Sequence, residues 1–424
     1  MGNLLSVFSN MEFANQTSGP SSGPKLLSIS ILHRHGSRGP GESELGPWKA
    51  DAPVRSQWGD NERENLSSTG HKQCLNLGEW FHKYTCQRGL GEAKEKVFFR
   101  SSKSGRAKES AQDFIHGFNL ERTNRIDETP VPYENKENAD NYFRPWKVLP
   151  GFSDTLKSRM ANDQLWADKA TENKELLETV FTKAGAAGVL TKLTKALWST
   201  TYLHCIKECE TFWPVSEGSR LVLTNLLSRE EWDAVTNLAC WVWEERFVRS
   251  GFTVSMGGKL VHEILSRSMD PLYEVNIFSG HDYTILAVLS LMGLIPRIDG
   301  PANFSCYVLF ELWDSVPPEH VSGPSRKLAD LSTVVPGGDG RILRVIFNSF
   351  PFDHSDNDEK LTVQDRNEKV LGEFTIPEME RIMNKAREDF HLFQTLEDHH
   401  AVEDEKDVHV LDDATNTPKR TVNA

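Results

Sequence analysis

The chain has 424 residues, of which 38% are hydrophobic and 26% are charged, and its formal net charge is −13. This length exceeds that of one typical domain, so we expect a large core with a second domain or an inserted lobe. The acidic balance argues against a nucleic-acid partner, and an anionic substrate would need a local cluster of cations. No apolar run approaches the length that spans a bilayer, so no transmembrane segment is expected.

The amino end favours an intracellular, cytoplasmic protein over an exported one. The apolar run at residues 4–8 is too short for a signal-peptide core, and no basic residue precedes it. Residues 1–6 fit the pattern for N-myristoylation on Gly2, and Lys25 is the first basic residue after them. One acyl chain without a polybasic second signal anchors only reversibly, so weak membrane contact through an acylated Gly2 stays open.

The six cysteines are too sparse for a disulfide scaffold and lack the spacing of a zinc ribbon. Cys205 and Cys209 lie one helical turn apart, which gives little support for a metal or redox role. The sequons at Asn15, Asn65 and Asn303 carry no meaning without export. No Walker-type glycine loop, nucleophile-elbow serine or zinc pattern is present.

The segment that organises the chain begins with an apolar run at residues 26–32, which ends in a loop rich in glycine and proline. This pattern predicts a buried strand followed by a loop. In that loop Arg34 and Arg38 bracket His35. Guanidinium groups match phosphate oxygens, an imidazole can attack phosphorus, and Gly36 lets the backbone approach closely. The alternative is a basic loop, or a histidine that merely packs, because short motifs often match by chance.

Helices and strands are expected to alternate after this loop. A helix should begin near Ser68, and residues 96–99 form a short apolar run typical of a buried strand. The next helix has its apolar positions at residues 107–118. Arg106 lies where the preceding loop meets the start of that helix, and free backbone N–H groups and the helix dipole favour an anion there.

Residues 119–269 show a different pattern. The first part contains several prolines, and long stretches with apolar residues at helical spacing follow. Leucines at residues 190–197 share one helix face, and apolar residues at 232–242 share another, with Gly251 as a stop. The tryptophans of this region are expected in the core because large apolar side chains at helical spacing usually pack inward. We interpret the region as a mainly helical lobe inserted into an α/β domain.

The α/β pattern then resumes with a strand over residues 272–278, after which His281 and Asp282 open a helix that ends at Gly293. Strands over 304–313 and 341–347 are expected to form an antiparallel edge, and a last helix begins near Pro377. The predicted division is a flexible segment, 1–24; a discontinuous α/β catalytic domain, 25–118 and 270–396; a helical cap, 119–269; and a disordered acidic tail, 397–424.

Three strand-to-helix turns therefore each deliver polar groups. Ligands of open α/β sheets bind outside the carboxyl ends of the strands, so we expect the three turns to converge on one pocket. The groups delivered are Arg34, His35 and Arg38 from the first turn, Arg106 from the second, and His281 and Asp282 from the third. His33 could suggest a His-x-His metal site, but it lacks a third ligand, so packing or orienting His35 is favoured.

Two motifs resemble those of the histidine acid phosphatases. Residues 34–40, Arg-His-Gly-Ser-Arg-Gly-Pro, resemble the R-H-G-x-R-x-P signature, and residues 279–284, Ser-Gly-His-Asp-Tyr-Thr, resemble the downstream His-Asp signature. The likeness covers most of residues 25–390. It implies an α/β fold with a phosphoglycerate-mutase-like three-layer core, a central, mostly parallel sheet and an inserted, mainly helical cap. It also implies hydrolysis of phosphomonoesters through a phosphohistidine, with no metal and no cofactor.

The resemblance also implies roles for single residues. His35 would be the nucleophile, and Asp282 would protonate the leaving alcohol. His35 must be neutral to attack and Asp282 must carry a proton, so the rate is expected to be highest on the acid side. The groups that would hold the phosphate oxygens are Arg34, Arg38, Arg106 and His281.

One loop departs from the family pattern. The family usually places an acidic residue between two arginines, as in R-S-T-D-x-x-R, whereas Lys103-Ser104-Gly105 stands here. The arginine spacing is kept, so we assign Arg106 and not Arg100 to the site. Lys103 adds a cation near the substrate or is simply solvated, and the solvated interpretation is favoured.

The predicted function is that of an acid phosphatase acting on a small-molecule phosphomonoester. A more selective phytase-like or lysophosphatidate-like phosphatase is the runner-up. A catalytically inactive protein that binds a phosphorylated ligand is the alternative from a different class. The substrate and the oligomeric state stay open.

Overall fold

A computed structural model of the protein describes most of the chain between Gly23 and Glu388. Gly2 and the predicted acidic tail lie outside the described residues, as does nearly all of the predicted lead-in. The described ranges are 23–91, 96–126, 131–132, 142–147, 149, 151–214, 217–295, 302–316, 340–349, 351–352, 362–364 and 367–388.

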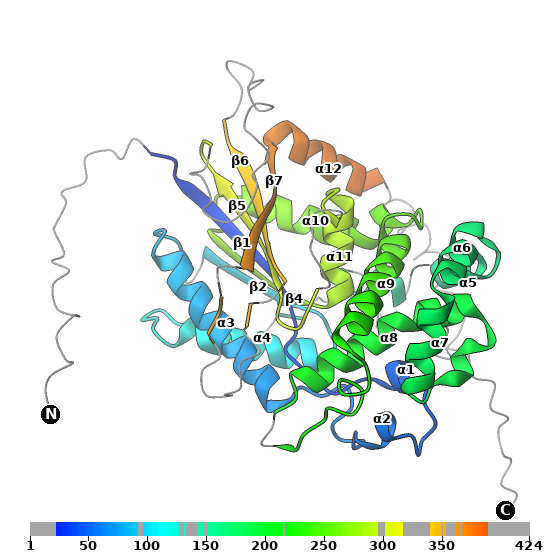
Figure 1. The fold of residues 1–424 in the computed structure, drawn as a ribbon. Helices are drawn as coiled ribbons and strands as arrows, with labels where there is room; N and C mark the ends of the chain where they lie inside the picture. Colours follow the sequence, from blue (N-terminus) through cyan, green and yellow to red (C-terminus); the bar gives the residue numbers. More distant parts are fainter. Residues whose placement is uncertain are drawn as a thin grey trace, which may run out of the picture.

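The described strands form one seven-stranded sheet in the order β3-β2-β4-β1-β5-β6-β7. β1 to β4 pair in parallel, whereas β5, β6 and β7 each pair antiparallel with the strand before them in this order. β6 therefore runs in the direction of β1, and the prediction of a mostly parallel sheet is confirmed (Figure 1). The strands are β1 (Leu26–Arg34), β2 (Val97–Ser101), β3 (Val131–Pro132), β4 (Val275–Gly280), β5 (Tyr307–Trp313), β6 (Ile342–Asn348) and β7 (Glu368–Thr375).

Helices cover the sheet on both faces, which is why the central strands are nearly continuous apolar runs. On β1, Ile29 and Ile31 pack with α3 (Ser68–Cys86) and α4 (Gly105–Asn119). The alternate residues Ser28 and Ser30 face the other way and hydrogen-bond to Ser268 of α10. Figure 1 shows α3 and α4 on one side of the sheet and α10, α11 and α12 on the other, so the core has three layers. The last three helices are α10 (Thr253–Met269), α11 (Asp282–Leu291) and α12 (Ile376–Glu388).

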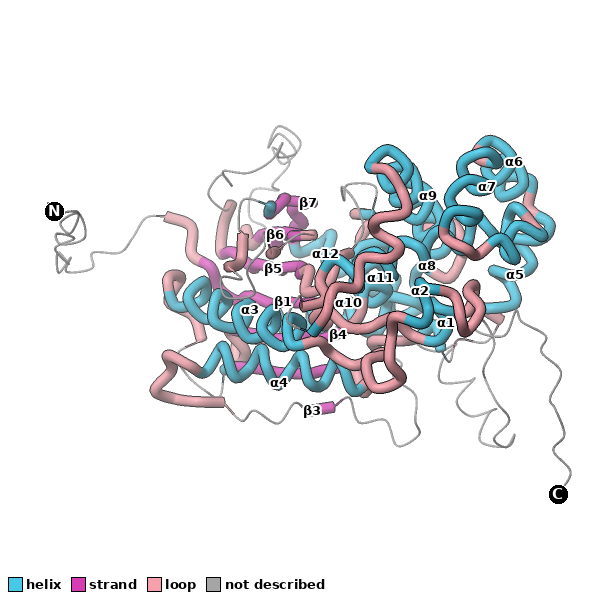
Figure 2. The backbone as a smooth tube through the Cα atoms, turned by 60° about the horizontal axis from the view of Figure 1, so that its bottom comes forward, coloured by secondary structure: helices cyan, strands magenta, loops and turns pink. Residues whose placement is uncertain are grey.

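The remaining long helices form a lobe at one end of the sheet, seen at the right of Figure 2. Its core includes the tryptophans expected there: Trp213, Trp232 and Trp243 are buried, and Trp241 is partly buried. Trp166 lies with its ring centroid 5.0 Å from that of Trp241 and 6.2 Å from that of Trp198. The helices are α5 (Phe152–Asn162), α6 (Gln164–Glu172), α7 (Lys174–Lys183), α8 (Leu193–Thr211) and α9 (Arg229–Phe247), with the 3-10 turns η2 (Pro145–Lys147) and η3 (Ala187–Thr191). Two short helices, α1 (Glu42–Leu45) and α2 (Pro53–Ser56), lie beside this lobe.

Three predicted boundaries were wrong. Leu190 does not share a helix with Leu193, because the extended backbone of Lys192 separates η3 from α8. β4 begins at Val275, since Leu272 lies exposed in a turn. α9 ends at Phe247, so Gly251, with φ +84°, lies in the loop beyond it.

The predicted division into an α/β domain and a helical cap stays a prediction. Two elements of the range 119–269 belong with the sheet in space, because β3 pairs with β2 and α10 packs on α11 and α12. Among the described residues, no helix combines the length and the apolar content needed to cross a membrane. All six cysteines lie in this part of the chain, and none forms a disulfide.

Candidate active site

The ends of three parallel strands lie side by side. Arg34, the last residue of β1, is paired with Gly280 of β4, and the backbone N–H of His35 donates to the Gly280 carbonyl at 3.1 Å. Ser102, which follows β2, donates its backbone N–H to the Ser279 carbonyl at 2.9 Å. The turns after β1, β2 and β4 therefore meet at one edge of the sheet, as the sequence predicted.

The loop after β1 is fixed by α3 and α4. The backbone N–H of Gly36 donates to Ser110 Oγ at 3.0 Å, and that of Ser37 donates to Gln73 Oε1 at 2.9 Å. A Cβ atom on Gly36 would lie 2.2 Å from the carbonyl oxygen of Gly70. Glycine is therefore required at position 36 by the contact of this loop with the start of α3.

The contacts of His35 define which ring nitrogen carries the proton. Nδ1 lies 2.9 Å from the Gly36 carbonyl oxygen, which can only accept, so Nδ1–H donates. Nε2 lies 3.2 Å from Arg106 Nε–H and accepts. Burial, together with the charges of Arg106 and Arg34, holds the pKa of His35 well below its usual value. The imidazole is therefore neutral, with its free electron pair on Nε2.

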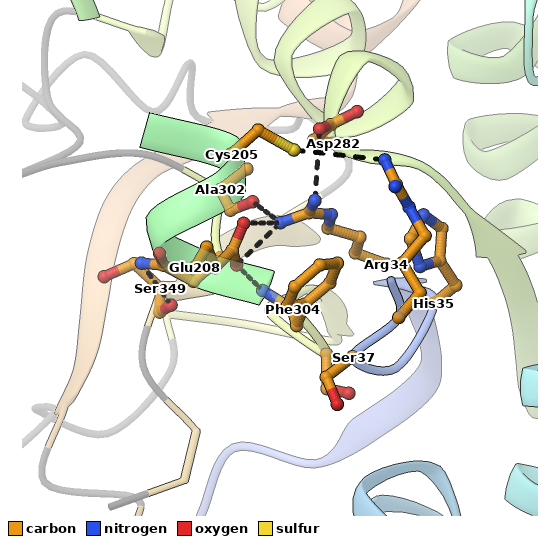
Figure 3. Close-up of polar contacts among 12 residues, drawn as sticks. Arg34, His35, Ser37, Cys205, Glu208, Asp282, Ala302, Phe304 and Ser349 are labelled. Carbon is orange, nitrogen blue, oxygen red and sulfur yellow. Dashed lines mark hydrogen bonds and ion pairs between the residues drawn. The ribbon is translucent and has the colours of Figure 1, made fainter. Parts of the chain in front are cut away.

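Arg34 is almost fully buried and links two carboxyl groups (Figure 3). Its Nη1 donates to both oxygens of Glu208, at 2.8 and 2.9 Å, and to the Ala302 carbonyl at 2.7 Å. Its Nη2 lies 3.3 Å from Asp282 Oδ2. The guanidinium carbon also lies 4.1 Å from the centre of the Phe304 ring. This set of contacts fixes Arg34 beside His35.

Glu208 of α8 is a site residue that the sequence analysis missed. It is buried, and it also accepts a hydrogen bond from the backbone N–H of Phe304. Burial raises the pKa of Glu208 despite the opposing effect of Arg34. The sequence carries no separate signal for Glu208, because its burial and its pairing with Arg34 are visible only in the structure.

Arg38 is buried and forms a bidentate ion pair with Glu44 of α1. Its Nη1 and Nη2 lie 2.9 and 2.6 Å from the two Glu44 oxygens. Burial alone would raise the pKa of Glu44, but Arg38 and the backbone N–H of Gly41 lower it to about 2. Cys205 of α8 donates to the same carboxylate at 3.1 Å. Glu44 is the second partner that the sequence analysis did not identify.

Arg106 lies at the start of α4, with Nη1 3.5 Å from Glu64 Oε2. Burial, with the charge of Arg38, lowers the pKa of Arg106 to about 10. Arg100 points elsewhere, since its Nη1 binds Glu263 of α10 at 2.9 Å. Of the two arginines weighed from the sequence, Arg106 is thus the one that contacts His35.

His281 and Asp282 begin α11. The ring centroid of His281 lies 5.4 Å from that of His35, and its Nε2 lies 2.9 Å from Ser102 Oγ. Burial, then the charges of Arg106 and Arg144, hold the pKa of His281 well below its usual value. Asp282 lies with Oδ1 2.7 Å from the backbone N–H of Tyr283 and with Oδ2 beside Arg34.

His33 lies behind the site and packs. Its ring stacks on Phe114 with centroids 4.7 Å apart, and its Nδ1 lies 3.1 Å from the Arg34 carbonyl. Burial lowers the pKa of His33 to about 4. No group of three or more metal-binding side chains gathers anywhere in the part of the chain that the structure describes.

The neutral imidazole of His35 thus lies among Arg34, Arg38 and Arg106. The carboxyl group of Asp282 contacts Arg34, which lies beside His35. Phosphoryl transfer depends mainly on positioning and on stabilising charge, and these groups supply both. The fold and this site define a phosphomonoester hydrolase. Residues 25–148, which include Arg34, His35, Arg38 and Arg106, match the family model of the histidine phosphatase superfamily (branch 2). This segment, which carries the turns after β1 and β2, is therefore similar to that branch of the superfamily.

Solved structures share the fold across most of the chain. A Klebsiella sp ASR1 phytase has 14% sequence identity and a TM-score of 0.61, over 86% of this chain and 95% of its own. The apo form of a Hafnia alvei phytase has 14% identity and a TM-score of 0.61, over 87% and 98%. A Citrobacter braakii phytase has 13% identity and a TM-score of 0.54, over 85% and 98%. No curated protein sequence gives a significant match.

Proposed function

We propose that the protein hydrolyses phosphomonoesters through a covalent phosphohistidine on His35, with Asp282 as the general acid. One observation carries this proposal: the unprotonated Nε2 of His35 is directed at Arg106, within the cluster of arginines. A phosphate group that enters between these two residues exchanges the hydrogen bond from Arg106 to His35 for contacts with its own oxygens. Arg34, Arg38 and His281 then complete the set of groups around the phosphate.

In the first step the electron pair of His35 Nε2 forms a bond to phosphorus, and the bond to the ester oxygen breaks. Asp282 gives its proton to that oxygen, which leaves as an alcohol. In the second step the Asp282 carboxylate takes a proton from water, and the resulting hydroxide displaces His35 from phosphorus. Inorganic phosphate leaves, and both residues return to their starting states.

A substrate pair with different leaving groups tests this assignment. In Asp282→Asn, we expect hydrolysis of an alkyl phosphate to fall by about 100-fold or more, and that of p-nitrophenyl phosphate to fall less, because p-nitrophenolate leaves without a proton. His35→Ala should abolish both activities and the phosphoenzyme that a quench without acid traps. His71→Ala, at an exposed histidine of α3, is the matched control. Activity that survives in His35→Ala would rule out the mechanism.

An inactive binding protein is the competing interpretation. Such a protein needs the arginines, but it has no use for a neutral histidine next to an acid. Incubation with p-nitrophenyl phosphate decides between them, because a binding protein would retain the ester and release no nitrophenol.

Substrate selectivity is a separate question. A Hafnia alvei phytase of the same fold has been solved in complex with myo-inositol hexakis sulphate, at a TM-score of 0.54, which makes phytate the first substrate to test. Phosphate release should be compared among phytate, lysophosphatidate, sugar phosphates and phosphotyrosine. Efficient hydrolysis of one of these alone would establish a selective phosphatase, and similar hydrolysis of all would establish a general one.

A further inference from the structure

A tight turn comes directly before β5 and lies beside the candidate site. The backbone N–H of Cys306 donates to the Asn303 carbonyl at 3.0 Å, which closes a turn of four residues. Ser305, the third residue of this turn, has φ +57°, a conformation in which glycine is the usual residue. Glu64 is the other non-glycine residue with a positive φ among the described residues, and it contacts Arg106. Such backbone conformations cost free energy and are frequent at functional sites.

The backbone of this turn is hydrogen-bonded to the two residues that begin the active-site loop. The N–H of Ser305 donates to the His35 carbonyl at 3.1 Å, and the N–H of Arg34 donates to the Cys306 carbonyl at 2.9 Å. The carbonyl of Ala302, just before the turn, accepts from Arg34 Nη1 at 2.7 Å. A shift of the turn would therefore break contacts with both residues.

Phe304, the second residue of the turn, packs against two groups of the site (Figure 3). Its ring centre lies 4.1 Å from the guanidinium carbon of Arg34 and 5.7 Å from the centre of the His35 imidazole, whose plane is tilted by 45°. The side chain is buried, and the backbone N–H donates to Glu208. Because the face of an aromatic ring attracts a cation, the ring restrains the Arg34 guanidinium as well as the imidazole.

The direction of the His35 ring depends on the groups packed around it, because the last side-chain torsion of a histidine has broad minima. The hydrogen bond from Nδ1 to the Gly36 carbonyl is one restraint. The ring of His281 is a second, with its plane at 72° and its centroid at 5.4 Å, and the ring of Phe304 is a third. Attack on phosphorus requires that Nε2 point at the reacting atom, so these restraints affect the rate.

We propose that Phe304 is a positioning residue for phosphoryl transfer: its ring holds the His35 imidazole and the Arg34 guanidinium in their working orientations, and the left-handed backbone of Ser305 holds the ring in place. The inference rests on the proposed function and deepens it. Phe304 neither makes nor breaks a bond in the reaction. Its loss therefore slows the formation of the phosphoenzyme more than it weakens the binding of phosphate.

The test uses Phe304→Leu, which keeps an apolar side chain and removes the ring. Rapid quench without acid, at saturating p-nitrophenyl phosphate, measures the rate of phosphoenzyme formation, and inhibition by inorganic phosphate measures binding. We expect the rate to fall by about tenfold and the inhibition constant to change by less than about threefold. Phe118→Leu in α4 is the matched control, because the Phe118 ring is also buried and lies 4.9 Å from the guanidinium carbon of Arg122. This control should keep the native rate.

A second pair of variants tests the turn itself. Glycine adopts the φ of Ser305 without strain, so Ser305→Gly should react at close to the native rate. Valine disfavours a positive φ, so Ser305→Val should slow phosphoenzyme formation as Phe304→Leu does. Thermal unfolding shows that each variant is folded, and Phe304→Met, with a flexible side chain that fills the same space, replaces Phe304→Leu if the latter does not fold.

The outcomes separate positioning from packing and from binding. Equal rates of phosphoenzyme formation in Phe304→Leu and Phe118→Leu would overturn the proposal. Inhibition by phosphate that weakens as much as the rate falls would assign Phe304 to substrate binding and overturn it as well. If the native protein forms no phosphoenzyme and releases no nitrophenol, the proposed function itself fails, which is a distinct result.

Discussion

Arg34 holds two carboxyl groups that differ in exposure. The Glu208 side chain is 5% exposed and the Asp282 side chain 26%. The charge of Asp282 contributes to raising the pKa of Glu208, so the two carboxyl groups repel each other across the arginine. Arg34 therefore holds Glu208 against the burial and the repulsion that both raise its pKa.

Glu208→Gln keeps the shape of the side chain and removes its charge. We expect kcat to fall by about tenfold, because Arg34 loses the charged partner that fixes it beside His35. Steady-state kinetics with p-nitrophenyl phosphate measure this change. Glu210→Gln in the same helix is the control, since Glu210 binds Gln57 and Thr224 away from the site. Equal kcat values for the two variants would contradict the positioning role of Glu208.

The sequence predicted some residues of the candidate site and missed others. Arg34, His35 and Arg38 are neighbours in one motif, so their chemistry was visible without a fold. Glu208 and Glu44 act through partners that only the tertiary structure brings near, and each is an ordinary glutamate of a helix in the sequence. Their assignment depends on burial, which a pattern of residue types does not determine.

At the scale of elements, α3 and α4 meet at two glycines. A Cβ atom on Gly78 would lie 1.9 Å from the carbonyl oxygen of Phe114, and one on Gly117 would lie 1.9 Å from that of Leu75. The backbones of α3 and α4 therefore approach each other more closely than a side chain at Gly78 or Gly117 would allow. This contact fixes α4, whose first turn carries Arg106, against α3, whose start supports the His35 loop.

Gly78→Ala should lower the free energy of unfolding by about 3 kcal/mol, since overpacking forces the two helices apart. Because α4 carries Arg106, the KM for a phosphomonoester should rise as well. Urea unfolding and steady-state kinetics measure the two effects. Gly188→Ala in η3 is the control, because a Cβ there meets nothing within 4 Å. A Gly78→Ala variant as stable as this control would show that the close contact is not maintained.

The elements that the sequence predicted best are the ones with an unbroken periodicity of apolar residues. α3 begins at Ser68 as expected, and His281 directly precedes α11. β7 was not predicted, because Gly372 interrupts its apolar pattern and its pairing with β6 shifts register between Val345 and Ile346. The four-residue helices α1 and α2 are too short to show a helical period.

At the scale of the whole molecule, several buried histidines are neutral. Burial lowers the pKa of His33 to about 4 and that of His204 to about 3. Between these values and 6.5, the unfolded chain binds protons that the folded chain does not, so stability falls as the pH falls. Glu44, with its pKa lowered to about 2, has the same sign of effect below pH 4.5.

We therefore expect the free energy of unfolding to decrease steadily from pH 6.5 to pH 4, by about 3 kcal/mol from His33 alone. Urea unfolding at a series of pH values measures this change. His71, which is half exposed and has a raised pKa, contributes with the opposite sign, so His71→Ala should steepen the loss. A free energy of unfolding that stays constant over this range would contradict neutral burial of these histidines.

The groups of the candidate site come from two parts of the molecule. The sheet supplies His35, but α8 supplies the Glu208 that holds Arg34, and the Ser37 hydroxyl donates to the carbonyl of Phe212 just beyond that helix at 3.2 Å. A variant whose helical lobe comes from a distant relative would therefore lose the contact between Glu208 and Arg34, as well as any substrate selectivity that the lobe provides. A replacement lobe that preserves these contacts must therefore keep the last turn of α8, which carries Glu208.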